Sequence, residues 1–131
     1  MIYLDNSATT LIKPHCVRGA FSKALSDYSA NPGRSGHSLS VRTAEAIYSA
    51  REKICEFFGA DDPAKVAFTM NCTQALNIVI KGVLQPGDHC IVSSMEHNAV
   101  MRPVYALSKT GVEYDEAHIV PGNDLETVNA F

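Results

Sequence analysis

The stretch VAFTMNCTQALNIVIKG, residues 66–82, decides how this chain folds. Its first residues are apolar and partly β-branched, which is typical of a strand, and the apolar run breaks at Asn71. After the break, Leu76, Val79 and Ile80 follow the spacing of one buried helix face. The stretch therefore predicts a strand, a tight turn and a helix.

The turn of this unit leads into the first residues of a helix. Backbone N–H groups there have no partner within the helix and lie at the positive end of its dipole. Cys72, Thr73 and Gln74 therefore offer donors to an anion such as phosphate, and the Thr73 hydroxyl lies beside them. The alternative is an ordinary N-cap, in which Asn71 or Thr73 satisfies its own helix. The residue types alone leave both interpretations open.

The composition excludes several classes of protein. The chain has 131 residues, 46% hydrophobic and 19% charged, which is ordinary for one soluble globular domain. A net charge of −3 gives no basic surface, and no apolar run approaches the roughly 18 residues of a membrane span. Residues 1–5 lack the features of a secretory signal. We therefore expect a cytoplasmic protein that has neither nucleic acid nor a membrane as partner.

The four cysteines are scattered along the chain and form no C-x-x-C pair. They are Cys16, Cys55, Cys72 and Cys90. Neither a zinc site nor a disulfide framework is indicated by this spacing. We expect no metal site.

Helices and strands are expected to alternate along the rest of the chain. In the first half we expect an extended lead with a short strand at 2–4, a helix at 14–28, a turn-rich loop at 31–37, and a helix that is capped by Ser38 or Ser40 and stops at Gly59. In the second half we expect a strand at 90–92, a helix capped by Asn98, a strand at 112–114 and the start of a helix at 123–126. Helix-length connections imply parallel strands, whose carboxyl ends collect ligands. Residues 69–73 and 94–97 both follow a strand, so we expect them to face one crevice.

Four motifs in this chain resemble the N-terminal portion of the cysteine desulfurases, in the same order and spacing. They are residues 3–10, 31–32 with 36–40, 68–77 and 95–100. The cysteine desulfurases are pyridoxal-phosphate enzymes of the class V aminotransferase group. The resemblance implies an α/β fold, as part of a fold type I large domain with a mostly parallel sheet and flanking helices. It implies an extended lead at 1–14, for a small domain or dimer contact, and the truncated N-terminal part of the cofactor-binding large domain at 15–131.

The resemblance also implies roles for individual residues. Cys72 and Thr73 match the pair that holds the phosphate of pyridoxal 5'-phosphate. His97 matches the histidine that stacks on the cofactor ring and is suspected of proton transfer there. Ala8 and His37 match segments at the substrate entrance, although packing or a dimer contact fits both equally well. A structural role in the helix behind the phosphate is implied for the remaining match, Asn77.

The activity implied by the resemblance is removal of sulfur from L-cysteine, which leaves alanine and an enzyme persulfide. A homodimer and a sulfur-acceptor protein are implied as partners. A related class V aminotransferase or a selenocysteine lyase, acting on a related amino acid, is the nearest alternative. A non-catalytic α/β remnant that binds phosphate or a partner is the alternative from another class.

The sequence departs from the family pattern in two places, and parts of the pattern are missing. Asn71 stands where many relatives have glycine, and Cys72 replaces a small alanine or threonine, of which only the backbone N–H is needed. We do not expect Cys72 to be the persulfide cysteine. None of the lysines has the context of the Schiff-base lysine, and the aspartate for the pyridine nitrogen is absent. We therefore expect this chain to be a piece of a longer protein.

These missing motifs predict that the 131 residues by themselves have no desulfurase activity. The reaction needs a positioned lysine amine, a partner for the pyridine nitrogen and a nucleophilic cysteine near the substrate. Purified chain, pyridoxal phosphate and L-cysteine should release sulfide no faster than pyridoxal phosphate and L-cysteine alone under reducing conditions. Sulfide release above that background would show that another lysine of this chain serves the reaction.

Overall fold

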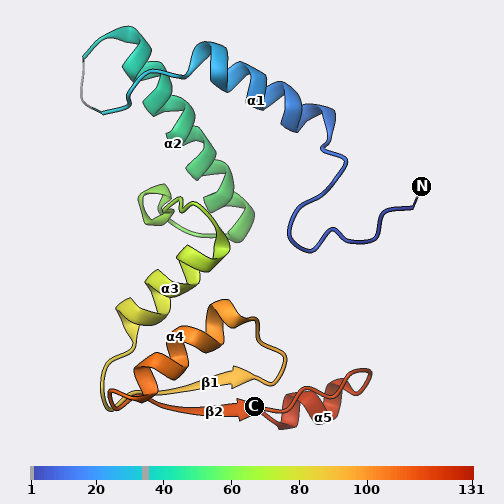
Figure 1. Cartoon of the computed structure of the whole chain (residues 1–131). Helices are drawn as coiled ribbons and strands as arrows, with labels where there is room; N and C mark the ends of the chain where they lie inside the picture. The colour runs from blue at the N-terminus through green and yellow to red at the C-terminus, as the bar shows by residue number, and fades with distance from the viewer. Residues whose placement is uncertain (1, 34–35) are drawn as a thin grey trace. The chain divides into compact units, whose positions relative to one another are not determined.

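The structure is a computed structural model that describes residues 2–33 and 36–131 (Figure 1). The chain forms two compact units, Met1–Ala67 and Phe68–Phe131. The first unit contains two long helices and a short 3-10 helix, and the second contains a parallel strand pair with helices. The predicted α/β class with a parallel sheet and flanking helices is confirmed. The predicted boundary after residue 14 stays a prediction.

The first unit is built on helices α1 (His15–Asp27) and α2 (Ser38–Phe58), followed by the 3-10 helix η1 (Pro63–Lys65). Both long helices were predicted from their apolar periodicity. Residues 2–14 contain neither helix nor strand, so the lead is extended but the strand expected at 2–4 is wrong. A strand needs a neighbour to pair its backbone groups, and the described residues place none beside it.

Helix α2 has a different N-cap from the one expected. His37 caps it, since its Nδ1 accepts a hydrogen bond from the Ser40 backbone N–H at 3.2 Å. The prediction of Ser38 or Ser40 as the cap is therefore wrong. Ser40 is buried, and its hydroxyl donates to the Asn31 carbonyl at 2.9 Å, which ties the preceding loop to the helix.

The other end of α2 is closed by glycine, as predicted. Gly59 adopts the left-handed conformation with φ 66°, and its N–H donates to the Glu56 carbonyl at 3.2 Å. The next N–H, from Ala60, donates to the Cys55 carbonyl at 2.9 Å. These two bonds form a Schellman motif, which satisfies carbonyls that the end of a helix leaves without partners.

The second unit contains α3 (Cys72–Val83), β1 (His89–Ser93), α4 (Asn98–Ser108), β2 (Glu113–Ala117) and α5 (Asp124–Asn129). Strands β1 and β2 pair in parallel, from His89↔Glu113 to Ser93↔Ala117, with α4 as the connection between them. Figure 1 shows α4 (orange) lying along the strand pair. Helix α4 contacts both α3 and β2, and the buried residues of this unit are Val92, Ala99, Pro103, Val104, Val112 and Ala117.

The strand predicted just before Asn71 is not formed either, so a second expected strand is wrong. Residues 66–69 have no regular secondary structure, although the break at Asn71 and the helix after it are as predicted. The residue types favour a strand, but strand formation depends on a neighbouring strand, and among the described residues only β1 and β2 pair with each other.

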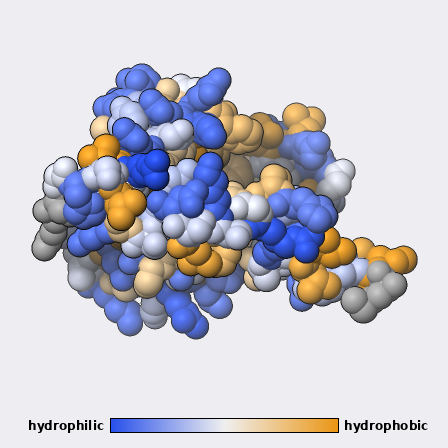
Figure 2. Space-filling view, turned by 90° about the horizontal axis from the view of Figure 1, so that it is seen from above, coloured by the Kyte–Doolittle hydropathy of each residue, from blue (hydrophilic) through white to orange (hydrophobic). Residues whose placement is uncertain are grey.

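Large apolar side chains are exposed on the helices of both units. Examples are Phe21 at 67% and Leu25 at 63% on α1, and Val79 at 58% on α3. Apolar atoms (orange) accordingly appear at the surface in Figure 2. Leu76 and Ile80, which share the predicted apolar face of α3, are half-buried. Exposed apolar helix faces of this kind favour association with other protein surfaces. Within the described chain, no helix has the length and apolar character needed to cross a membrane.

Two glycines of the first unit give a matched test of this backbone geometry. Gly59→Ala should lower the free energy of unfolding by about 1–2 kcal/mol, because an L side chain is strained in the left-handed conformation. Gly19→Ala, inside α1 with no atom within 4 Å of the added Cβ, should raise the free energy of unfolding by about 0.5–1 kcal/mol. Urea denaturation of both variants measures these changes. Equal effects of the two substitutions would contradict the assignment of Gly59.

Candidate functional site

The first turn of α3 combines a complete N-cap with two N–H groups that the cap does not use. Asn71 has an extended backbone with φ −165°, and its Oδ1 accepts from the Gln74 N–H at 2.8 Å. In return, Gln74 Oε1 accepts from the Met70 N–H at 2.8 Å. This reciprocal arrangement resembles a capping box. Because φ of Asn71 is not positive, the turn does not depend on glycine at this position.

The N–H groups of Cys72 and Thr73 have no hydrogen-bond partner within residues 2–33 and 36–131. The Thr73 side chain is exposed, and the first turn of α3 contains no acidic residue. Two free donors, a neighbouring hydroxyl and the positive end of the helix dipole suit a phosphate group. The N-cap and the anion-binding interpretation are therefore compatible, since they use different N–H groups of the same turn.

His97 lies just beyond the carboxyl end of β1 and is the N-cap of α4. Its Nδ1 accepts from the Ala99 N–H at 3.0 Å, and its carbonyl accepts from the N–H groups of Val100 at 2.9 Å and Met101 at 3.2 Å. Asn98 was expected to be the cap, which is wrong, because the helix begins at Asn98 itself. The imidazole of His97 remains exposed.

The turn between β1 and His97 is held by three hydrogen bonds. The Ser93 hydroxyl donates to Glu96 Oε1 at 2.8 Å. Ser94 donates its N–H to the Ala117 carbonyl at 2.8 Å and accepts from the Ile119 N–H at 2.9 Å through its hydroxyl. These bonds hold the segment after β1 against the segment after β2. The positions of the two carboxyl ends of the strand pair are therefore fixed relative to each other.

Asn77 joins the first turns of α3 and α4. Its Nδ2 donates to the Thr73 carbonyl at 3.0 Å and to the Ala99 carbonyl at 3.4 Å. One side-chain nitrogen therefore contacts the backbone of the predicted phosphate-binding turn and the backbone of the turn that His97 caps. This contact is the structural role expected for Asn77.

Ala8 and His37, the other residues singled out by the sequence, belong to the first unit. Ala8 is exposed in a bend of the extended lead, and His37 is the cap of α2. The expected place of both residues at a substrate entrance stays a prediction.

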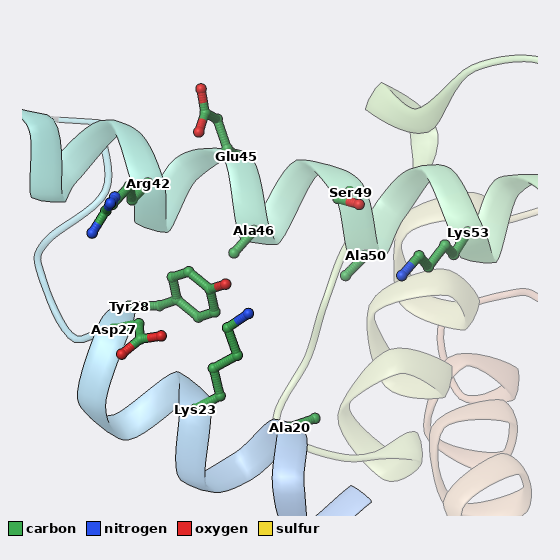
Figure 3. A pocket seen from close by; sticks show the side chains of 10 residues that line it. All are labelled: Ala20, Lys23, Asp27, Tyr28, Arg42, Glu45, Ala46, Ser49, Ala50 and Lys53. Carbon is green, nitrogen blue, oxygen red and sulfur yellow. The ribbon is translucent and has the colours of Figure 1, made fainter. Parts of the chain in front are cut away.

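A groove of about 680 Å³ lies between α1 and α2 (Figure 3). Lys23 of α1 and Tyr28, the C-cap of that helix, extend toward α2, with the Lys23 ammonium 5.8 Å from the centre of the Tyr28 ring. Arg42 and Lys53 line the same groove from α2, and no ion pair joins these cations to an acid within the described chain. None of the residues predicted for the site lines this groove.

No cluster of three or more histidine, cysteine, aspartate or glutamate residues that could hold a metal ion occurs in the part of the chain that the structure describes. The four cysteines are free.

Two features of the site were missed from the sequence. The first is N-capping by His97 and His37, and the only signal for it was a histidine directly before each helical pattern. The second is the contact between Asn77 and Ala99. The four-residue spacing from Thr73 to Asn77 placed both on one face of α3, but nothing in the sequence indicated that α4 packs there.

Comparisons with known proteins agree with this structure. A profile of the aminotransferase class-V family matches residues 2–129. A probable cysteine desulfurase of Vibrio cholerae is 37% identical over 107 residues, which cover 79% of this chain and 26% of the relative. The cysteine desulfurase IscS of Pseudomonas aeruginosa is 34% identical over 128 residues, which cover 94% of this chain and 31% of the relative.

Solved structures give the same result. The apo structure of a cysteine desulfurase from Thermococcus onnurineus NA1 superposes with a TM-score of 0.77 at 28% identity, covering 88% of this chain and 30% of that one. The cysteine desulfurase CsdA from Escherichia coli gives a TM-score of 0.61 at 30% identity, covering 86% and 29%. The chain spans less than a third of the length of each of these relatives.

The link made by Asn77 can be tested by a change from amide to carboxylate. Asn77→Asp should lower the free energy of unfolding by about 1–3 kcal/mol, because a carboxylate has no N–H to donate and faces two carbonyl oxygens. Gln74→Glu is the matched control on the same helix, since its carboxylate still accepts from the Met70 N–H. Denaturant unfolding compares the two variants, and equal stability would exclude a structural link through Asn77.

Proposed function

This chain belongs to the class V aminotransferase family, and we propose that it supplies the phosphate-binding and ring-stacking residues of a cysteine desulfurase-like enzyme. The observation that carries the proposal is the first turn of α3. There the N–H groups of Cys72 and Thr73 have no partner among the described residues, and the Thr73 hydroxyl is exposed beside them. The sequence relatives named cysteine desulfurase support the same activity class.

The residues of this turn fit the phosphate of pyridoxal 5'-phosphate. Cys72 would contribute its backbone N–H, and Thr73 its backbone N–H and its hydroxyl. No carboxylate in the first turn of α3 opposes the negative charge. The cofactor, when bound, supplies an electron sink for bond cleavage in an amino acid.

His97 is proposed to stack on the ring of the same cofactor. In support, Asn77 contacts both the Thr73 carbonyl and the Ala99 carbonyl, so the turn that would hold the phosphate and the turn that His97 caps are neighbours. The main-chain and side-chain bonds of His97 fix its position before any ligand binds. A ring held in this way loses little conformational entropy when it contacts a ligand.

The substrate of the whole protein is proposed to be L-cysteine, whose sulfur would pass to an enzyme cysteine and then to an acceptor protein. Selenocysteine or another amino acid is the alternative substrate within the same family. The homodimer and the cytoplasmic location implied by the resemblance stay predictions.

The phosphate-binding assignment can be tested on the chain itself with pyridoxine 5'-phosphate, which has no aldehyde to react with lysines. The amide NMR signals of Cys72, Thr73 and Gln74 should shift on titration, and pyridoxine without phosphate should leave them unchanged. Thr73→Ala should weaken binding about 5- to 150-fold, which corresponds to about 1–3 kcal/mol for a lost hydrogen bond to a charged group. Thr73→Ser keeps the hydroxyl and serves as the matched control.

Shifts confined to the groove of Lys23, Arg42 and Lys53 would place anion binding elsewhere and contradict the proposal. If Thr73→Ala binds pyridoxine 5'-phosphate as tightly as the unsubstituted chain does, the Thr73 hydroxyl does not contact the phosphate.

A further inference from the structure

The hydrogen bond that caps α4 also determines where the proton of His97 resides. His97 Nδ1 lies 3.0 Å from the Ala99 backbone nitrogen, and the Ala99 N–H points to it. A backbone N–H can only donate, so Nδ1 must present a lone pair. A neutral imidazole has one protonated nitrogen and one lone pair, which leaves the proton on Nε2.

We propose that the N-cap of α4 holds His97 as the Nε2-protonated imidazole, so that the neutral side chain presents Nε2–H as a hydrogen-bond donor. The proton position follows from the cap alone. Its consequence for the reaction rests on the proposed function, in which His97 contacts the cofactor.

The donor that fixes the ring is itself rigidly placed. Ala99 is only 6% exposed, and its carbonyl accepts from Asn77 on α3. The carbonyl of His97 accepts from Val100 and Met101, so the residue is held by both its main chain and its side chain. The cap therefore belongs to the packed contact between α3 and α4 and does not depend on a mobile loop.

The cap and a proton on Nδ1 of His97 exclude each other. Nε2 already carries a proton, and the only lone pair in the plane of the ring is the one that Nδ1 shares with the Ala99 N–H. For His97 to accept a proton, Nδ1 must bind it and release the Ala99 N–H. That step places an imidazolium at the positive end of the α4 dipole. It also leaves the N–H of Ala99, the second residue of α4, without a hydrogen-bond partner. Proton uptake by His97 therefore requires the cap to open.

Nitrogen NMR of the histidine rings tests the proposal directly on the 131-residue chain. Long-range hydrogen–nitrogen correlation spectra distinguish protonated from unprotonated ring nitrogens. We expect the neutral ring of His97 to show an unprotonated Nδ1 and a protonated Nε2. The variant His97→Asn identifies the signals of His97 by their loss, and its amide oxygen can still cap α4.

Two other histidines serve as internal references. His37 caps α2 through Nδ1, at 3.2 Å from the Ser40 N–H, and should show the same proton position. His89 Nε2 lies 2.9 Å from Asp115 Oδ2, so its proton also belongs on Nε2, for a different reason. A His97 ring protonated on Nδ1, or one that averages both forms, would overturn the proposal.

A variant of the donor gives a second, independent test. Ala99→Pro removes the N–H at a position of the helix where it has no intrahelical partner, and it leaves His97 itself unchanged. His97 should then lose its fixed proton position, while His37 keeps its own. An unchanged His97 spectrum in Ala99→Pro would overturn the proposal.

A final measurement addresses the consequence for the reaction. In the presence of pyridoxine 5'-phosphate, His97 should keep its proton on Nε2, and movement of that proton from Nε2 to Nδ1 would overturn the donor role. The spectra without ligand do not depend on phosphate binding. A failure of the tautomer assignment is therefore distinguishable from a failure of the phosphate titration.

Discussion

Each helix begins with N–H groups that the helix itself cannot satisfy, and the second unit is arranged around two such beginnings. In α3, Asn71 satisfies the N–H of Gln74 with its side chain and that of Ala75 with its carbonyl. In α4, His97 satisfies the N–H of Ala99 with its ring. Among the described residues, the N–H groups of Cys72 and Thr73 are the ones that remain without a partner at the start of α3. The capping residues thus determine which donors are left for a ligand, and Asn77 keeps the two helix beginnings together.

Much of the fold could be predicted because the apolar residues of a helix recur with a regular spacing in the local sequence. The spacing of apolar residues located α1, α2 and α3, and Gly59 marked the end of α2. The strand expected before residue 69 was wrong because strand formation depends on a partner elsewhere in the chain, which residue types cannot report. The caps of α2 and α4 were wrong because serine and asparagine are the usual N-caps, whereas the chain places a histidine at both positions.

The site was predicted in part, for a similar reason. A helix beginning after Asn71 indicated donors at Cys72 and Thr73 before any resemblance was considered, and the motifs then gave these residues a ligand. The local sequence was sufficient to predict these donors. The contact between Asn77 and Ala99 and the orientation of the His97 ring depend on how α4 packs against α3. Packing between segments distant in sequence has no signature in either segment alone.

The connection between β1 and β2 has a consequence for how this unit assembles. The two strands pair in parallel, and α4 is the only element between them in the chain. The buried residues Val92, Val104 and Val112 therefore come from one continuous segment. Because the connection is continuous, closing it costs less chain entropy than pairing strands from distant parts of a longer chain would. The pairing of the two strands therefore requires the α4 connection between them, and α3 packs onto this segment through its contact with α4.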